Sequence, residues 1–455
     1  MQRIALSLVA TLFLAGCSTL RTRPETPANP LPAAYVHGTA GQPAAAPPLE
    51  NWWRSVDDPA LTVWIDTALA RNADLAAALI RVRRASLESQ MAANALWPTL
   101  SSSLSTGVSR PLSGPSRSRT ESGAANLGVA WEVDLFGRLG ALRDAAQFEA
   151  LATQDDRRGV ALSLTASVAS LYWQLAYVNE RIALARQSLA YAQRTRDLVE
   201  AQYQNGAVSG LERHEAAQLV TSQQAALSQL QQSHDELLQT IAVVLDGQGL
   251  PTAEPTQFPS RRLPAVQPGL PADLLARRPD LRAAEQRLRA TLASGDADRL
   301  RYYPALSLTG ALGTSSASLL HLLSNPVATL GVGVTLPFLN VREMRLATDI
   351  AGARYEEAVV LFRKSLLTAF TEVEKALSAR SHLQAQALLL QQSLEQTRAI
   401  ELRSEARYRY GQTALRVWLD AQERRRAAEL ALASTRFEQH QNHIALVQAL
   451  GGGLD

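Results

Sequence analysis

Four segments of the chain alternate between apolar residues and small or polar residues with a period of two, which predicts β-strands. The four segments are residues 100–108, 126–135, 306–312 and 330–338. Strands of about 9–11 residues with one apolar face are typical of transmembrane β-barrels. A soluble sheet packed on a core would show the same alternation. Acidic residues on the polar face of the second segment favour the barrel over the soluble sheet.

Long helical stretches occupy most of the remaining chain. Helical periodicity covers residues 60–95, 138–204, 272–300 and about 340–410. At 1.5 Å per residue, a helix over 138–204 would extend on the order of 100 Å, far beyond an ordinary globular helix. Gly206 and Gly411 end the two long helices, and shorter helices return from them toward Leu245 and Leu450. We interpret each pair as a coiled-coil arm with one face toward water.

The chain from residue 60 onward is a tandem repeat of about 205 residues. Five landmarks recur at a spacing of 205 or 206 residues: Asp74 and Asp280, Pro98 and Pro304, Tyr203 and Tyr408, Glu215 and Asp420, and Leu245 and Leu450. The first repeat covers residues 60–247 and the second 272–455, with a linker over 248–271. Each repeat is expected to contain a short helix, two strands, a long helix and a return helix.

The N-terminus has the features of a bacterial secretion signal. A short positively charged start and an apolar stretch too short to span a bilayer end in Leu-Ala-Gly before Cys17, the only cysteine of the chain. This string resembles the bacterial lipobox. We therefore expect a lipoprotein signal peptide over 1–16 and a lipidated Cys17, with an ordinary signal peptide as the alternative. Residues 17–59, with seven prolines between 21 and 50, are interpreted as a lipid anchor and extended tether.

The composition and the motifs argue against several function classes. The 45 Lys+Arg against 42 Asp+Glu give a net charge of only +3, with scattered arginines, so we expect no nucleic-acid partner. A single cysteine excludes a disulfide framework and a multi-cysteine zinc site. His440 and His443 lack a third ligand in the pattern, so we expect no metal site. No catalytic motif stands out, so we expect no enzyme, no catalytic residue and no cofactor besides the lipid on Cys17.

The number of strands has a consequence for assembly. Four strands cannot close a transmembrane barrel, which needs about eight. An open sheet edge in lipid would leave backbone N–H and C=O groups without hydrogen-bond partners. If these strands span a membrane, the chain must form an oligomer. A dimer would supply eight strands and a trimer twelve.

Several strings in the chain resemble the outer-membrane factor family, the TolC- and OprM-like (NodT-type) channel lipoproteins of bacterial tripartite efflux systems. The strings are residues 131–138 (WEVDLFGR), 277–282 (RRPDLR), 302–308 (YYPALSL) and 449–453 (ALGGG). They occur together with the lipobox and the duplicated strand–helix halves. The resemblance therefore covers nearly the whole mature chain.

The resemblance implies a mixed α+β membrane protein. The family forms a homotrimer with a 12-stranded β-barrel in the outer membrane, continued by a 12-helix periplasmic α-barrel. As partners it implies a periplasmic membrane-fusion adaptor, an inner-membrane pump, usually of the resistance-nodulation-division type, and outer-membrane lipid. Cys17 would carry a diacylglycerol and an N-acyl chain. The implied function is passive export of drugs or other small toxic compounds, with the substrate selected by the pump.

The turns between long and return helices are the candidate contacts to the adaptor. By resemblance, the adaptor docks and the pore closes at this end of the molecule. We therefore expect Asn205 and Gly206 in the first repeat, and Gly411 and Gln412 in the second, to contact the adaptor.

Three charged residues after the second turn are the candidate pore gate. Arg416, Asp420 and Glu423 follow at helical spacing, which places them on one face. In a trimer each would form a ring of three charges, and an acidic ring can gate a constriction. Asp420 matches the family's acidic position, with Glu215 as its first-repeat counterpart, whereas Arg416 departs from the aliphatic residue expected there. A solvated charged face with local ion pairs is the alternative.

Glu132 and Asp134 are candidates for the lumen of the barrel, where they would tune selectivity; structural hydrogen bonding at the barrel base is the alternative.

Two other functions fit the pattern as a whole. The same architecture could serve as the duct of a type I protein-secretion system, which a neighbouring ABC transporter would favour. A lipid-anchored structural coiled coil without a pore is the other, and the four strand segments argue against it.

Overall fold

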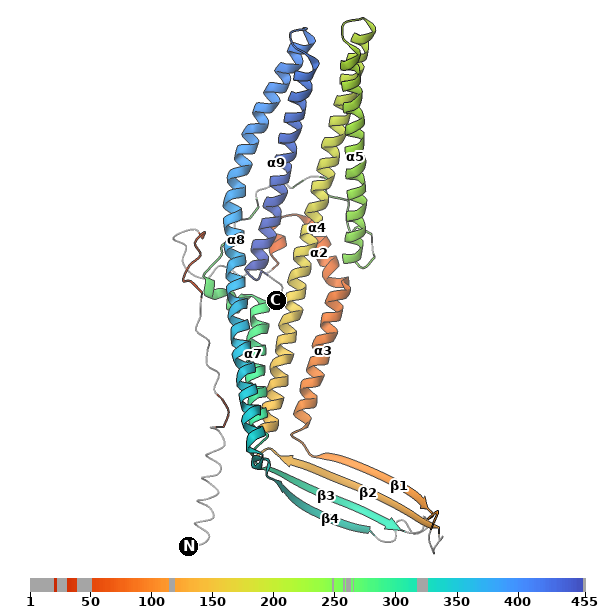
Figure 1. Cartoon of the computed structure of the whole chain (residues 1–455), viewed down its shortest axis with the longest axis vertical. Helices are drawn as coiled ribbons and strands as arrows, with labels where there is room; N and C mark the ends of the chain where they lie inside the picture. Colours follow the sequence, from red (N-terminus) through yellow and green to blue (C-terminus); the bar gives the residue numbers. More distant parts are fainter. Residues whose placement is uncertain are drawn as a thin grey trace. The chain divides into compact units, whose positions relative to one another are not determined.

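The protein is represented by a computed structural model, shown in Figure 1. It describes residues 20–22, 31–38, 51–113, 119–247, 249–256, 258, 263–264, 266–316 and 326–452. The expected signal peptide over 1–16 and the lipidation site Cys17 lie outside the described residues.

The same order of elements occurs twice along the chain. After the short helix η2 (Trp52–Val56), the first repeat contains α2 (Pro59–Arg71), α3 (Ala73–Asn94), β1 (Thr99–Ser109), β2 (Thr120–Val133), α4 (Arg138–Gln204) and α5 (Gly210–Val244). The second contains η3 (Pro271–Asp273), α6 (Leu274–Arg277), α7 (Pro279–Leu300), β3 (Ala305–Ser316), β4 (Pro326–Thr335), η5 (Pro337–Leu339), α8 (Val341–Arg409) and α9 (Leu415–Ala449). The long helices α4 and α8 have 67 and 69 residues and are rich in strong helix formers such as Ala, Leu, Gln and Arg.

The short helix expected at the start of each repeat is broken in both. In the first repeat the break falls at Asn72, whose side-chain oxygen accepts the backbone N–H groups of Asp74 and Leu75 at 3.0 and 3.1 Å. This is an N-cap, which starts a new helix at that point. In the second repeat the break falls at Arg278 because Pro279 disfavours the helical conformation of the residue before it.

The chain divides into two compact units. The described residues of the sheet unit fall within 1–29, 80–155 and 282–365, and those of the hairpin unit within 30–79, 156–281 and 366–455. The four strands and α7 from residue 282 onward belong to the sheet unit. The two hairpins, α4 with α5 and α8 with α9, turn within the hairpin unit (Figure 1).

The sheet unit contains one antiparallel sheet in the order β1-β2-β3-β4 (Figure 1). β2 ends at Val133 and β4 at Thr335, two to three residues earlier than the alternating pattern suggests. The chain turns after β2 because Asp134 caps α4 and Gly137 adopts a positive φ of 81°. The strand ends are therefore set by the start of the following helix rather than by the end of the alternation.

The hairpin unit holds the largest buried side chains. Trp53, Trp64, Trp173, Ile65 and Leu175 are almost completely buried there. Within the described part of the chain, α4 also contains a stretch long and apolar enough to cross a membrane, but 61% of that stretch is buried inside the protein. We interpret its apolar face as helix packing, since a core helix shows the same property.

Candidate functional site

The four strands present one apolar and one polar face. The register places Leu100 opposite Val129, Leu127 opposite Leu312, and Leu308 opposite Val332, all on the same face. On this face Leu330 is 92% exposed, and Leu104 and Val332 are each 73% exposed. A contiguous apolar patch of this kind marks contact with lipid or with another protein.

The opposite face of the sheet is built from small and hydroxyl side chains. Ser307 lies opposite Gly333, and Thr309 opposite Gly331. Their hydroxyls donate to the facing glycine carbonyls at 3.3 and 3.4 Å. A Cβ added at either glycine would lie 2.7 Å from the facing hydroxyl oxygen, so the serine and threonine fill the space that glycine leaves. Short polar side chains leave room on this side of the sheet, as the wall of a water-filled pore requires.

The two edge strands of the sheet, β1 and β4, each have one side that no described strand of the chain pairs. Because the sheet has four antiparallel strands, β1 and β4 run in opposite directions. The β4 edge of one copy can therefore pair antiparallel with the β1 edge of another. This is the geometry that a closed ring of identical chains needs.

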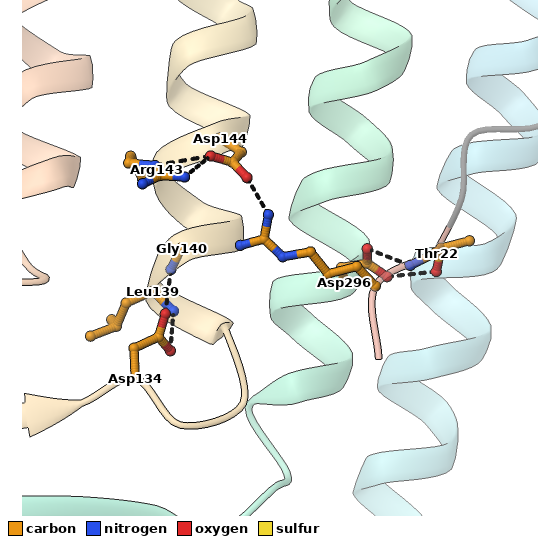
Figure 2. Close-up of polar contacts among 8 residues, drawn as sticks. Thr22, Asp134, Leu139, Gly140, Arg143, Asp144 and Asp296 are labelled. Atoms are coloured by element: carbon orange, nitrogen blue, oxygen red, sulfur yellow. Dashed lines mark hydrogen bonds and ion pairs between the residues drawn. The ribbon is translucent and has the colours of Figure 1, made fainter. Parts of the chain in front are cut away.

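Glu132 and Asp134 lie where β2 meets α4. Arg138 donates to both carboxylate oxygens of Glu132, at 2.7 and 2.8 Å. Asp134 accepts the backbone N–H groups of Leu139 and Gly140 at 3.0 and 2.7 Å (Figure 2). Glu132 shares the polar face with Ser307, its partner in β3. Both carboxylates thus have structural hydrogen bonds, and Glu132 also lies on the polar face of the sheet.

The two hairpin turns have the same backbone structure. Gly206 and Gly411 adopt φ of 72° and 69°, a conformation that favours glycine. The residue after each glycine donates to a carbonyl five residues back: Ala207 to Gln202 at 2.9 Å, and Gln412 to Arg407 at 2.8 Å. These are Schellman ends, which stop a helix and reverse the chain.

The neighbouring Asn205 and Gln412 complete the turns expected to contact the adaptor. Asn205 Nδ2 donates to the carbonyl of Ala201 at 2.8 Å, which adds a further hydrogen bond to the end of α4. A Cβ at Gly206 or Gly411 would meet nothing within 4 Å. Both turns are therefore open surface in this structure.

The gate candidates have different surroundings. Asp420 is exposed and has no hydrogen-bond or ion-pair partner among the described residues. Arg416 lies 3.9 Å from Glu215 across the two hairpins, and its side chain is 75% exposed. Glu423 pairs with Arg426. Asp420 is thus the candidate whose carboxylate has no partner among the described residues, while the other three candidates are in ion pairs.

A buried cluster behind the turns was missed by sequence reasoning. Val199, Ala216, Tyr408, Leu415 and Trp418 pack together, with Tyr408 stacked on Trp418 at 5.3 Å between ring centroids. Tyr203, the first-repeat counterpart of Tyr408, is 40% exposed and lies outside the cluster, so the recurrence of the tyrosine does not signal it.

Polar links join the first hairpin to the second beside this cluster. Tyr191 on α4 donates to Glu405 on α8 at 2.8 Å, and Tyr408 donates to Gln202 at 2.6 Å. Burial and the hydrogen bond to Glu405 raise the pKa of Tyr191, so its hydroxyl stays a donor. The turn ends of the hairpins are therefore held to one another within a single chain.

His440 and His443, excluded from metal binding at the sequence level, lie in the hairpin unit. His440 contacts the rings of Phe258 and Trp173, with 4.8 Å between ring centroids in each case. Burial lowers the pKa of both histidines, that of His443 to about 4. Among the residues that the structure describes, no group of three potential ligands could hold a metal ion.

Comparisons with known proteins identify the family. Residues 64–246 and 270–452 each match the family described as "Outer membrane efflux protein". The chain is 34% identical over 459 residues to the pyoverdine export outer membrane protein OpmQ of Pseudomonas putida, covering 98% of this chain and 96% of OpmQ. It is 31% identical over 471 residues to the toluene efflux pump outer membrane protein TtgC, also of Pseudomonas putida, covering 100% of this chain and 96% of TtgC.

A solved structure shares the fold. The outer-membrane channel OprN superposes with a TM-score of 0.82 and 28% sequence identity, covering 95% of this chain and 99% of OprN. The double family match shows the tandem repeat, and the expected efflux function and outer-membrane location are confirmed. The chain belongs to the outer membrane efflux protein family and is a TolC-like efflux channel of the outer membrane.

Proposed function

We propose that three copies of the chain close a 12-stranded barrel, with β4 of each copy paired to β1 of the next. The observation that carries this proposal is the two-faced sheet with two unpaired, oppositely directed edges in the described chain. Four strands are too few to close a barrel, and lipid does not tolerate an open edge. The apolar face then meets lipid and the polar face lines the pore. The long helices continue the channel as a periplasmic α-barrel of twelve helices.

The duct is passive and exports drugs or other small toxic compounds. Its polar face carries short serine, threonine and glycine side chains, which offer little chemistry for selecting a substrate. Relatives that match over nearly the whole chain carry the names of pyoverdine export and toluene efflux. Selection and energy therefore come from the partners, a periplasmic adaptor and an inner-membrane pump of the resistance-nodulation-division type. The adaptor contacts the turns at Gly206 and Gly411, and Asp420 forms the acidic ring at the constriction.

Cys17 carries the lipid anchor of the mature protein. The support is the lipobox-like string before the only cysteine of the chain. A diacylglycerol and an N-acyl chain provide two attachment signals, which is what stable membrane anchoring needs.

The experiment that tests the pore uses two neighbouring residues on opposite faces of β4. Leu330→Arg places a charge on the lipid face, where it costs about 2–4 kcal/mol near the bilayer centre, and Thr329→Arg places it in the lumen. We expect Leu330→Arg to abolish assembled trimer in native mass spectra of outer-membrane extracts. Thr329→Arg should keep the trimer and alter dye export from a strain lacking its own channel. Equal behaviour of the two variants, or a dimer, would contradict the proposal.

Partner identity is tested separately by removing the pump. Export of a fluorescent dye should stop when a resistance-nodulation-division pump is deleted and persist when ABC transporters are deleted. The reverse result would identify an ABC transporter as the pump, the partner class of a type I secretion system, and would contradict the proposed partner.

A further inference from the structure

A short N-terminal segment, residues 20–22, lies against the sheet unit. The backbone N–H of Thr22 donates to Oδ2 of Asp296 at 2.9 Å, and its hydroxyl donates to Oδ1 at 2.6 Å. Figure 2 shows Thr22 facing both oxygens of this carboxylate, which is on α7. One side chain therefore recognises both the backbone and the side chain of a residue that is 274 positions away.

Asp296 is a buried carboxylate whose partners include this segment. It is 6% exposed and also accepts from Arg299 at 3.0 Å. Arg299 in turn donates to the carbonyl of Leu20. A buried carboxylate is costly unless hydrogen bonds surround it, so Thr22 supplies part of what keeps Asp296 stable in this position.

Arg21 is held on the other side, by the start of α4. Its guanidinium donates to Asp144, which is also bound by Arg143. A Cβ added at Gly140 would lie 2.6 Å from Nη2 of Arg21, so Gly140 leaves the space that Arg21 occupies. The segment is thus held by two carboxylates from two different helices. Gly140, which has no side chain, leaves room for the Arg21 guanidinium.

The position of these contacts matters for the membrane. Asp296 lies four residues before the end of α7, which leads into β3, and Asp144 six residues after the start of α4, which follows β2. At 1.5 Å per residue these positions are about 6 and 9 Å from the strand-side helix ends. Cys17 precedes Leu20 by three residues, which reach about 11 Å at full extension. A lipid attached at Cys17 would therefore be tethered within this reach of the docked segment.

We propose that Asp296, Asp144 and Gly140 form a docking site for residues 20–22, and that this site holds the lipid anchor in the membrane leaflet where the strands begin. The proposal rests on the proposed lipidation of Cys17 and on the membrane-spanning barrel. Asp296 is a positioning residue: it fixes the tether between the acyl chains and the sheet unit. Its ligand is the Arg-Thr peptide of the same chain.

Trypsin provides a direct readout. It cleaves after Arg21, at the peptide bond whose N–H donates to Asp296, whereas Arg23 is followed by Pro24 and resists cleavage. Cleavage removes residues 17–21 with their lipid, a change that intact-mass spectrometry of the purified full-length protein detects. Asp296→Ala removes both hydrogen bonds of Thr22, and we expect cleavage to be about tenfold faster than in the unmodified protein.

Matched variants separate docking from general loosening. Thr22→Val loses only the hydroxyl contact and should give an intermediate rate, while Thr22→Ser should match the unmodified protein. Asp298→Ala, two residues further along α7, removes a carboxylate that pairs with Arg354 at 3.6 Å and should leave cleavage unchanged. Helix content by circular dichroism should be equal in all variants.

Two results would overturn the proposal, and they are distinguishable. Equal cleavage of Asp296→Ala and the unmodified protein would show that residues 20–22 are not docked at Asp296. An unmodified protein whose intact mass lacks acyl chains on Cys17 would refute the lipidation, and with it the anchoring role of the site.

Discussion

In each repeat, the side chain at the break between the first two helices bonds to the last residue of the return helix. We call this contact the joint of the repeat, and the two repeats make it with different side chains. In the first repeat, Asn72 Nδ2 donates to the carbonyl of Val244 at 3.1 Å. In the second, Arg278 Nη1 donates to the carbonyl of Ala449 at 3.0 Å. Val244 and Ala449 are the last residues of the return helices α5 and α9, 205 positions apart. The hydrogen bond to the end of the return helix is common to both repeats, while the donor differs.

The second joint is also more tightly packed and more highly charged. Arg278 makes further bonds to Glu372 and Asp280 at 2.7 and 2.8 Å. Beyond the helix, Gly451 takes the left-handed conformation that Asp246 takes in the first repeat. A Cβ at Gly451 would lie 2.7 Å from the backbone of Arg277. The two repeats thus bond the same backbone carbonyl, at the end of the return helix. They differ in the number of further hydrogen bonds that the donor side chain makes.

Two glycine substitutions should distinguish the cost of close packing from the cost of a strained backbone, and one of them should give the largest loss of unfolding free energy. Gly451→Ala adds a Cβ against backbone and strains a positive φ of 77°, so we expect a loss of about 3 kcal/mol. Gly247→Ala strains a similar φ of 71° with nothing within 4 Å, and should lose only about 1 kcal/mol. Denaturant unfolding of the purified protein measures both, and equal losses would remove the claim of a tighter second joint.

Acid should destabilise the second repeat and spare the first. Burial, helped by Arg380 and His440, lowers the pKa of His443 to about 4. Its neutral form is favoured in the folded protein, so stability present above pH 6.5 is lost as the pH falls toward 4, by about 3 kcal/mol at most. The unfolding midpoint should therefore fall between pH 7 and pH 5, and His443→Phe should reduce the fall. An unchanged pH slope in that variant would contradict the assignment.

His234 on the first return helix should respond with the opposite sign. Burial works to lower its pKa, but hydrogen bonds to Glu254 and Asp235 outweigh burial and raise the pKa. A raised pKa adds stability in acid that is lost as the pH rises through it. His234→Gln should therefore make the protein more sensitive to acid, the reverse of His443→Phe, in the same measurement.

Removing the donor side chain of each joint should lower the unfolding free energy by different amounts, and the difference should be smaller than that between the two glycine variants. Arg278→Ala leaves the Ala449 carbonyl and two carboxylates without their partner, a loss of about 2 kcal/mol because both carboxylates are partly exposed. Asn72→Ala removes an N-cap and one bond to a carbonyl, a loss of about 1 kcal/mol. Arg278→Lys should not restore stability, since lysine lacks the fork that binds Asp280. Full rescue by lysine would show that only the charge matters.

The smallest effect concerns the hairpin turns. In the first, the backbone N–H of Ser209 donates to Glu212 at 2.8 Å, whereas the N-cap residue of α9 is Ala414, which has no capping side chain. Ala414→Ser combined with Val417→Glu copies the first cap into the second turn. We expect a gain of up to about 1 kcal/mol in unfolding free energy. No gain would mean that the second turn is already satisfied by other contacts.

Much of the fold was predictable from local patterns. The alternation placed all four strands, and the ends of α4 at Arg138 and Gln204 agree with the expected range. The breaks at Asn72 and Arg278 were not predicted, because a cap or a proline inside a continuous helical pattern leaves the periodicity intact. The ends of β2 and β4 were placed too late, since the apolar alternation continues into residues whose backbone is already committed to the next turn.

The candidate site was predictable only where a residue type is typical of one backbone conformation, as glycine is of a positive φ. Gly206 and Gly411 were identified as turn glycines, and both have positive φ. The docking of Thr22 on Asp296 could not be inferred, because it joins residues 274 positions apart that share no motif. The gate role of Asp420 and the lumen role of Glu132 stay predictions, since both depend on how copies of the chain assemble.

We propose that the two-faced sheet forms a pore, and planar-bilayer conductance of the purified protein measures whether it conducts ions. We predict discrete, ion-conducting steps from the unmodified protein, with larger or more frequent steps in Asp420→Ala because the acidic ring that we propose at the constriction would be lost. Steps that are identical in the two proteins would keep the pore and place its constriction elsewhere. No steps from either protein, with trimer and membrane insertion verified, would show that the sheet does not form a pore.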